Sequence, residues 1–291
     1  MKFIPETQLV LNSDGSVYHL KVKPGDVADT IILVGDPQRV NMVSSCFDQV
    51  ELRVSNREIV THTGTYRGKR ISAMSTGMGT DNIDIVLNEL DALFNIDFES
   101  RTEKPVKTSL KLIRLGTSGA LQPSVVPGEN YVAATHGLGL DGLIHFYKDS
   151  EKVIDQSLTQ SFVEQSNWPA QLPFPYIVEG SVALRKLLAY DYIHGITATA
   201  PGFYGPQGRT LRLPVFFSDG IERIIETDLL GMRIANFEME TSALYGLSKM
   251  MGHEALTICL VIANRITEKF LPDYKPHMQK LIQNTLDRLT E

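Results

Sequence analysis

The sequence predicts an α/β fold in a single domain, with a central mixed, largely parallel β-sheet flanked by helices. Short apolar runs rich in leucine and β-branched residues alternate along the chain with segments of helical periodicity, which is typical of this class. The chain has 291 residues, of which 43% are hydrophobic, enough for a sizeable core. Neither an internal repeat nor a linker rich in proline or serine divides it, so we expect residues 1–291 to form one domain.

Four apolar runs predict strands that are buried on both faces. Each has about the length of a strand and leads into a glycine or a polar residue. The runs cover residues 30–36, 69–79, 110–121 and 255–265. Cys259 lies inside the last run and is expected to be a buried free thiol, since Cys46 and Cys259 form no metal or redox motif.

Three segments with apolar residues three or four positions apart predict helices. The first covers residues 83–94, and the second ends at Gly252, a residue type that commonly caps helix C-termini. The third is the C-terminal tail, with apolar positions from residue 278 to residue 289. Between the first helix and the next strand, residues 97–109 are charged, contain proline and lack periodicity, so we expect an inserted surface loop there.

Charge and hydropathy exclude several classes of partner. The net charge is −6, which does not favour nucleic acid. The longest apolar runs are too short to span a membrane. The N-terminal residues lack the apolar segment of a signal peptide, and we expect a cytoplasmic location.

Small and cationic residues gather where the predicted strands end. Ligands of open α/β sheets bind beyond the carboxyl ends of the strands, and these ends supply Gly35, Arg39, Arg114 and Thr117. Small residues let backbone N–H groups approach an anion, and an arginine forks onto its oxygens. Together they indicate a phosphate or carboxylate site, although each piece alone is more commonly a tight turn or an ion pair.

Two further segments carry polar residues with a chemical interpretation. In "NFEMET", Glu238 and Glu240 flank Met239 ahead of a helix, so a carboxylate could hold a ribose diol or could simply stabilise the helix dipole. In "GFYGPQGR", Gln207 and Arg209 stand near an aromatic ring. An amide beside a guanidinium suits a planar ligand with alternating donors and acceptors, and the alternative is a surface turn with an unrelated ion pair.

The ordered set of "GDPQRV", "SNRE", "STGMG", "IRLGTSGALQ", "GFYGPQGR", "NFEMET" and "VIANR" resembles the nucleoside phosphorylase-I superfamily, and within it the uridine-cleaving branch. The resemblance runs from about Tyr18 to Arg265. It implies reversible phosphorolysis of uridine to uracil and ribose 1-phosphate, with inorganic phosphate as co-substrate and no cofactor. Ala263 stands where the purine-cleaving branch carries an aspartate, which favours a pyrimidine base.

The resemblance also implies roles for individual residues. The residues expected at phosphate are Gly35, Arg39, Arg57, Arg114 and Thr117. Those expected at the sugar are His19, Glu238, Met239 and Glu240, and those at the base are Phe203, Gln207, Arg209 and, in support, Arg265. Arg39, Arg114, Gln207 and Arg209 would carry the catalysis.

Arg57 and His19 resemble residues that enter the site from a neighbouring subunit. The resemblance therefore implies a homo-oligomer with sites at a dimer interface. Hexamers are common in the family. Glu58 resembles a ligand of an interface potassium site, but Asn82 replaces the serine of that site, so a potassium ion stays an open question.

Two alternatives stay open from the sequence. One is a purine-directed phosphorylase or a nucleosidase of the same superfamily. The other is a nucleoside-binding protein on the same fold without turnover.

Overall fold

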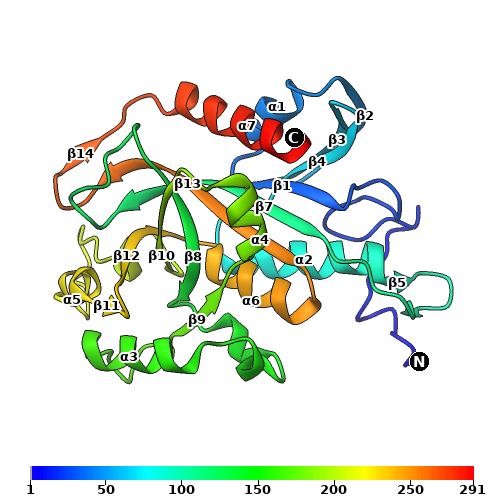
Figure 1. Ribbon diagram of the computed structural model, residues 1–291. Helices are drawn as coiled ribbons and strands as arrows, with labels where there is room; N and C mark the ends of the chain where they lie inside the picture. The colour runs from blue at the N-terminus through cyan, green and yellow to red at the C-terminus, as the bar shows by residue number, and fades with distance from the viewer. Residues whose placement is uncertain (1) are drawn as a thin grey trace.

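A computed structural model describes residues 2–291 and shows a large β-sheet with helices on both sides (Figure 1). The strands are β1 (Thr30–Val34), β2 (Gln49–Asn56), β3 (Ile59–Tyr66), β4 (Lys69–Ser75), β5 (Ile96–Asp97), β6 (Thr102–Glu103), β7 (Lys111–Ala120), β8 (Tyr131–Gly139), β9 (Tyr176–Glu179), β10 (Ile193–Thr199), β11 (Asp228–Leu229), β12 (Met232–Glu238), β13 (Glu254–Asn264) and β14 (Lys269–Phe270). The α-helices are α1 (Pro37–Ser44), α2 (Thr80–Asn95), α3 (Gln156–Ser166), α4 (Val182–Leu188), α5 (Gly220–Glu226), α6 (Thr241–Met251) and α7 (Lys275–Thr290). Short 3₁₀ turns are η1 (Leu143–Phe146), η2 (Ser150–Lys152) and η3 (Gly205–Gln207).

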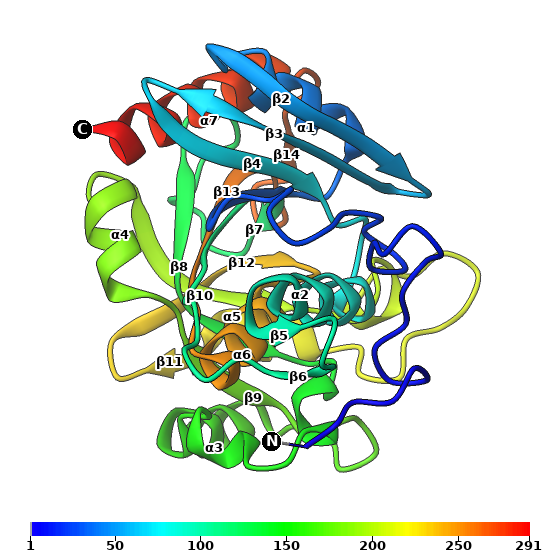
Figure 2. The ribbon, with the colours of Figure 1, turned by 90° about the vertical axis from the view of Figure 1, so that its right-hand side faces the viewer.

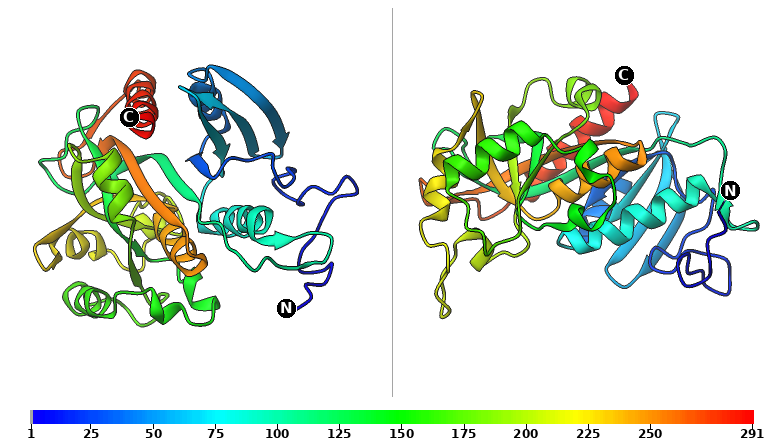
Figure 3. Two further views of the ribbon diagram at one scale, coloured as in Figure 1. Left: turned by 45° about the vertical axis from the view of Figure 1, so that its right-hand side comes forward. Right: turned by 90° about the horizontal axis from the view of Figure 1, so that it is seen from below.

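Twelve strands form one mixed sheet, whose main path runs β11-β12-β10-β8-β13-β7-β1-β4-β3-β2. Part of it closes on itself, because β12 also pairs antiparallel with β7 through Asn236 opposite Ala120 and Phe237 opposite Gly119. Strands β7, β13, β8, β10 and β12 therefore form a closed ring of five strands. The strands β2, β3 and β4 lie at one end of the molecule and the helices α3 and α5 at the other (Figure 3).

The prediction of a mixed sheet is confirmed, but the prediction that it is largely parallel is wrong. Parallel pairs join β1 to β4 and β7, β10 to β8 and β12, and β13 to β7. The remaining pairs are antiparallel, including β2–β3, β3–β4, β8–β9 and β8–β13. For β2, β3 and β4 the reason is local, since tight turns at Arg57 and at Arg67–Gly68, all with positive φ, fold these strands into hairpins.

Alternate residues of the central strands face two separate cores. Ile31 and Leu33 of β1 pack with α2 and α6, whereas Ile32 and Val34 pack with α1, α4 and α7. Figure 2 shows α2 and α6 side by side, and α1 and α7 lie on the other side of the sheet (Figure 1). Burial on both faces explains why the strand runs are almost wholly apolar.

The predicted elements lie close to their expected ranges. The four strand runs correspond to β1, β4, β7 and β13, and the helical patterns correspond to α2, α6 and α7. Gly252 caps α6 at φ 80°, as predicted. Within residues 2–291, no helix combines the length and the hydropathy needed to cross a membrane.

The segment 97–109 lies between α2 and β7 in the sequence and outside the large sheet. Part of it pairs as the small hairpin β5–β6, and most of its side chains are exposed. Arg101 in its turn donates to the backbone oxygens of Ile4 at 2.8 Å and Leu9 at 2.5 Å. The segment therefore holds the N-terminal residues against the body of the protein.

Candidate active site

A cavity of about 620 Å³ opens where β1, β4, β7, β12 and β13 end. We call it the site cavity. Its walls include the strand-end residues Gly35, Gly77, Thr117 and Ala263. Carboxyl ends of several strands thus converge on one hollow, as expected for a ligand site in an α/β sheet.

Two buried arginines on one side of the site cavity have donors without partners. Arg39 on α1 gives one bond, from Nη1 to the backbone oxygen of Leu115 at 3.2 Å. Its Nε, and the Nε of Arg114 on β7, are buried and find no hydrogen-bond partner among residues 2–291. Burial, and then the charge of Arg114, lower the pKa of Arg39. Since both arginines line the cavity, an anion there would pair with their positive charge.

Arg114 is also held by two carboxylates. Its Nη1 lies 3.3 Å from Oε2 of Glu238, and its Nη2 pairs with Oε2 of Glu240. Burial alone would lower the pKa of Arg114, but the charges of Glu240 and Glu238 outweigh burial and raise it. For Glu240 burial dominates and raises the carboxyl pKa, although Arg114 opposes that effect.

Glu238 and Glu240 have different surroundings, although both line the site cavity. Glu238 accepts from the backbone N–H groups of Glu240 at 3.0 Å and Thr241 at 3.0 Å, and from the hydroxyl of Thr199 at 2.7 Å. These bonds fix it at the N-terminus of α6. Glu240 accepts from the N–H of Gly79 at 2.8 Å, and apart from this bond and Arg114 it faces the cavity beside Met239.

Another part of the wall is the 201–209 loop, which carries Phe203, Gln207 and Arg209. Nη1 of Arg209 donates to Oε1 of Gln207 at 2.5 Å and to the backbone oxygen of Phe203 at 2.6 Å. The guanidinium carbon lies 3.8 Å from the centroid of the Phe203 ring. Burial, followed by the nearby charge of Arg265, lowers the pKa of Arg209. The predicted amide–guanidinium pair thus exists, and Arg209 itself covers one face of the ring that was expected to face a base.

Most of the sequence-predicted residues come together in the site cavity. Its lining includes Gly35, Arg39, Arg114, Thr117, Phe203, Gln207, Arg209, Glu238, Met239 and Glu240. Arg265 lies behind the 201–209 loop, where its Nη1 donates to the backbone oxygen of Gln207.

His19 and Arg57 do not line the site cavity of their own chain as far as residues 2–291 show. Nδ1 of His19 lies 2.6 Å from Glu89, whose carboxylate also accepts the His19 N–H at 3.0 Å. Arg57 occupies the β2–β3 turn at φ 53°, with its guanidinium 5.9 Å from the centre of the Tyr18 ring.

Four lining residues were not predicted from the sequence. Pro37, Met78, Phe237 and Phe270 also line the site cavity. Met78 is 75% exposed within a glycine-rich turn, a position that could have marked it. Phe270 belongs to the two-residue strand β14, which is too short to give a pattern.

The residues considered for a cation site, Glu58 and Asn82, lie near Gly77. Among residues 2–291, His, Cys, Asp and Glu form no group of three or more that could hold a metal ion. Asn82 and Glu58 converge on Gly77, since a Cβ built there would lie 2.3 Å from the Asn82 amide nitrogen and 3.1 Å from Glu58 Cγ.

Comparison with known proteins adds independent findings. The sequence profile described as the phosphorylase superfamily matches residues 29–290. A uridine phosphorylase of Thermococcus kodakarensis is 34% identical over 259 residues, which cover 88% of this chain and 80% of that protein. A DeoD-type purine nucleoside phosphorylase of Streptococcus thermophilus is 30% identical over 250 residues, 84% of each chain.

Solved structures show the same likeness. The crystal structure of a Trypanosoma brucei nucleoside phosphorylase that shows uridine phosphorylase activity matches with a TM-score of 0.87 and 32% identity, over 97% of this chain and 99% of that one. A match to work on two uridine phosphorylases of the oomycete Phytophthora capsici has a TM-score of 0.70 and 22% identity, over 100% of this chain and 99% of that one. The second match supports the fold alone.

Proposed function

The chain belongs to the phosphorylase superfamily, and from this premise we propose that it catalyses the reversible phosphorolysis of uridine to uracil and ribose 1-phosphate. One observation carries the proposal. A single cavity of about 620 Å³ joins buried arginines with unpartnered donors to the amide–guanidinium pair of Gln207 and Arg209. Glu240 and Met239 lie on the lining between a place for phosphate and a place for a base.

Phosphate would bind against Arg39 and Arg114, with the small residue Gly35 and the Thr117 hydroxyl alongside. Both arginines are buried, so their charges act in a poorly screened environment. They would hold the phosphate in line with C1′ of the sugar, which supplies proximity and offsets the repulsion of an anionic nucleophile. No covalent intermediate with the protein and no organic cofactor is needed.

The base would leave towards the 201–209 loop. As the glycosidic bond breaks, negative charge grows on the uracil carbonyls, and Arg209 and the Gln207 amide would donate to them. Such donors bind the transition state more strongly than the ground state. Arg209 orients the Gln207 amide through Oε1, and Arg265 holds its backbone, so the pair is arranged before substrate binds.

The sugar would lie between these two groups, with its hydroxyls on Glu240 and its face on Met239. Glu240 now pairs with Arg114, and an entering phosphate would compete for that arginine. Release of Glu240 then frees a carboxylate for the ribose diol. Glu238 is held by bonds from the hydroxyl of Thr199 and the N–H groups of Glu240 and Thr241, so it would act in support.

Ala263 supports a pyrimidine rather than a purine base. It lies in the site cavity at the end of β13, and a methyl group there can neither protonate nor hydrogen-bond N7 of a purine. The relatives include both uridine and purine nucleoside phosphorylases, so the choice of base rests on this local chemistry.

The positions of His19 and Arg57 support a homo-oligomer. Neither lines the site cavity of its own chain as far as residues 2–291 show, and Arg57 lies in a turn between two strands. We infer that a neighbouring copy supplies them, which makes a dimer the smallest active unit and leaves the hexamer as a larger assembly of such dimers.

A substrate panel with and without phosphate tests the proposal. Uridine, deoxyuridine, thymidine and inosine are incubated with the protein, and release of free base is followed. We expect base release from uridine that depends on phosphate, with ribose 1-phosphate as the other product. Release without phosphate would mean a nucleosidase, preference for inosine a purine phosphorylase, and nucleoside binding without release a non-catalytic protein.

A further inference from the structure

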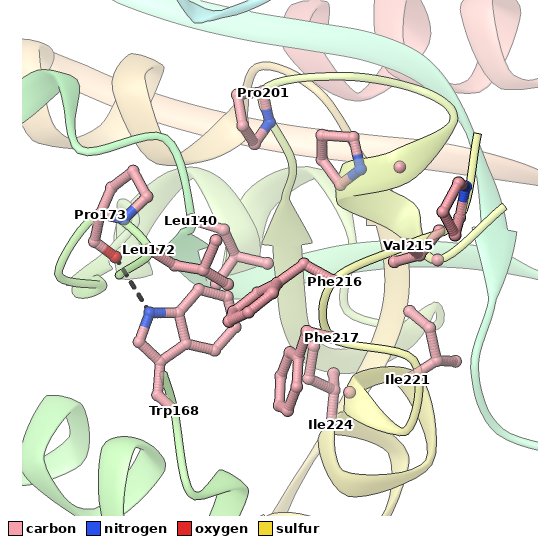
Figure 4. Close-up of a pocket in the computed structure, with 15 residues that line it drawn as sticks. Leu140, Trp168, Leu172, Pro173, Pro201, Val215, Phe216, Phe217, Ile221 and Ile224 are labelled. Carbon is pink, nitrogen blue, oxygen red and sulfur yellow. Dashed lines mark hydrogen bonds between the residues drawn. The ribbon is translucent and has the colours of Figure 1, made fainter. Parts of the chain in front are cut away.

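The 201–209 loop separates the site cavity from a second cavity. One face of the loop lines the site cavity through Phe203, Gln207 and Arg209. The other face lines a second space through Pro201, Gly205, Pro206 and Gly208. We call this space the apolar cavity (Figure 4).

The apolar cavity has a volume of about 300 Å³ and a uniform chemistry. Aromatic rings of Trp168, Phe216 and Phe217 form part of its wall, with aliphatic side chains and prolines around them. Among residues 2–291, no charged or hydroxyl-bearing side chain lines it. The indole N–H of Trp168 donates to the backbone oxygen of Pro173 at 3.0 Å (Figure 4), so the polar edge of that ring is satisfied.

A space of this kind favours an apolar occupant over water. Water in a cavity needs two to four polar partners, and an apolar cavity of about 150 Å³ already binds benzene. The apolar cavity is larger than that and is partly open to solvent, since Phe216 on its wall is 68% exposed. Its size and rings fit an uncharged molecule of one or two rings.

The loop between the cavities is held mainly by its own bonds. The N–H groups of Gln207 and Arg209 both donate to the backbone oxygen of Tyr204, at 3.1 and 2.8 Å. The bond from Arg265 ties Gln207 to the β13–β14 turn, and Gly208, at φ 68°, packs so closely on Ile221 that a Cβ would lie 2.4 Å from its Cγ1. An occupant pressing on Pro206 and Gly208 would therefore act directly on the residue between them, Gln207.

We propose that the apolar cavity is a second ligand site, for an uncharged aromatic molecule of one or two rings, and that its occupation changes the affinity of the site cavity for the nucleoside base. The inference goes beyond the proposed function, because the residues of this cavity take no part in the reaction. The coupling is structural, since one loop forms a wall of both cavities.

Trp168 makes binding directly measurable, because it is the only tryptophan of the chain. Bromobenzene, an uncharged heavy-atom quencher, is titrated into the protein while Trp168 fluorescence is recorded. We expect saturable quenching in the unaltered protein. Ile224→Phe and Val215→Phe, which each place an additional ring in the cavity and narrow it, should abolish saturation, whereas Leu187→Phe on the exposed face of α4 should not.

Quenching that stays linear in bromobenzene, or that persists in folded Ile224→Phe and Val215→Phe variants alike, would overturn the site. Thermal unfolding curves establish that each variant is folded. This experiment needs no turnover, so a failure to cleave uridine would reject the proposed function and leave the test of the cavity intact.

Coupling is tested by kinetics at saturating bromobenzene. We expect the KM for uridine to change by about fivefold or more, within the usual range for linked sites, while the KM for phosphate at saturating uridine stays constant. The Val215→Phe variant should show no effect of bromobenzene on either constant. Saturable quenching with an unchanged uridine KM would overturn the coupling.

Discussion

At the scale of single residues, Arg114 is the group on which the site cavity depends most. It is buried between Glu238 and Glu240 while its Nε has no partner among residues 2–291. A buried charge that loses its partners is strongly destabilising, so Arg114 can leave Glu240 only if another anion replaces the carboxylate. Phosphate is such an anion, and in the proposed reaction this exchange would link the binding of phosphate to the binding of the nucleoside.

The first prediction concerns that link. Sulfate, as an unreactive substitute for phosphate, should raise the affinity for uridine by about fivefold or more, because it frees Glu240 for the ribose hydroxyls. Isothermal titration of uridine with and without sulfate measures the effect. Glu240→Gln should remove the sulfate dependence, and equal affinities in the unaltered protein would contradict the exchange.

The second prediction concerns Arg209. Arg209→Ala should lower kcat/KM for uridine by about 100-fold or more, since it removes a donor to the charge that develops on the base and frees the Gln207 amide to rotate. Steady-state kinetics at saturating phosphate give the value. Arg212→Ala, an exposed arginine in the same segment, is the matched control. Intact uridine cleavage by Arg209→Ala would show that the base is held elsewhere.

At the scale of elements, the 201–209 loop is positioned by helix α5. Gly208 takes the left-handed conformation at φ 68°, and Ile221 of α5 fills the space where a side chain would stand. By contrast, a Cβ at Gly205 in the same loop would meet nothing within 4 Å. A side chain at Gly208 would therefore meet tightly packed atoms, whereas a side chain at Gly205 would find open space.

The third prediction compares these glycines. Gly208→Ala should raise the KM for uridine by about tenfold and lower the melting temperature, because left-handed backbone and contact with Ile221 together cost on the order of 1–3 kcal/mol. Gly205→Ala should leave both values nearly unchanged. Kinetics and thermal unfolding of both variants measure the difference, and equal behaviour of the two would contradict positioning by α5.

The elements also show what sequence alone could predict. Ile31 to Val34 belong to an unbroken apolar run because alternate residues enter different cores, so the strand and its burial could be predicted. The antiparallel pairing of β2, β3 and β4 could not be predicted, because these hairpins depend on turns at Arg57 and Arg67–Gly68. Phe270 could not be predicted in the site, because it reaches the cavity through pairing of β14 with β13.

At the scale of the whole molecule, helix α7 contacts several segments that are far apart in the sequence. Its buried face joins the core that contains α1 and α4. Tyr66 donates to Asp287 at 2.7 Å, and Arg288 pairs with Asp191 at 2.7 Å. None of the described residues of α7 lines the site cavity, so its contribution should be to stability.

The fourth prediction separates stability from catalysis. Ile282→Ala should lower the free energy of unfolding by about 2–5 kcal/mol, the usual cost of removing a fully buried large aliphatic side chain. Its kcat/KM for uridine should stay unchanged below the melting transition. Denaturant unfolding and kinetics measure the two effects, with exposed Lys280→Ala as control. A changed KM at full stability would contradict this separation.

The closed ring of strands also has a consequence for how the protein folds while it is being synthesised. Strand β7 meets β13 in the ring, and beside that pair Leu110 hydrogen-bonds His253, 143 residues further along. In a nascent chain leaving the ribosome, the edge of β7 that pairs with β13 therefore stays unpaired until β13 has been translated. Contacts of such long range form slowly, and incomplete chains expose unpaired strand edges. Premature termination anywhere before Asn264 should thus yield polypeptides for the cell's quality-control machinery rather than truncated enzymes.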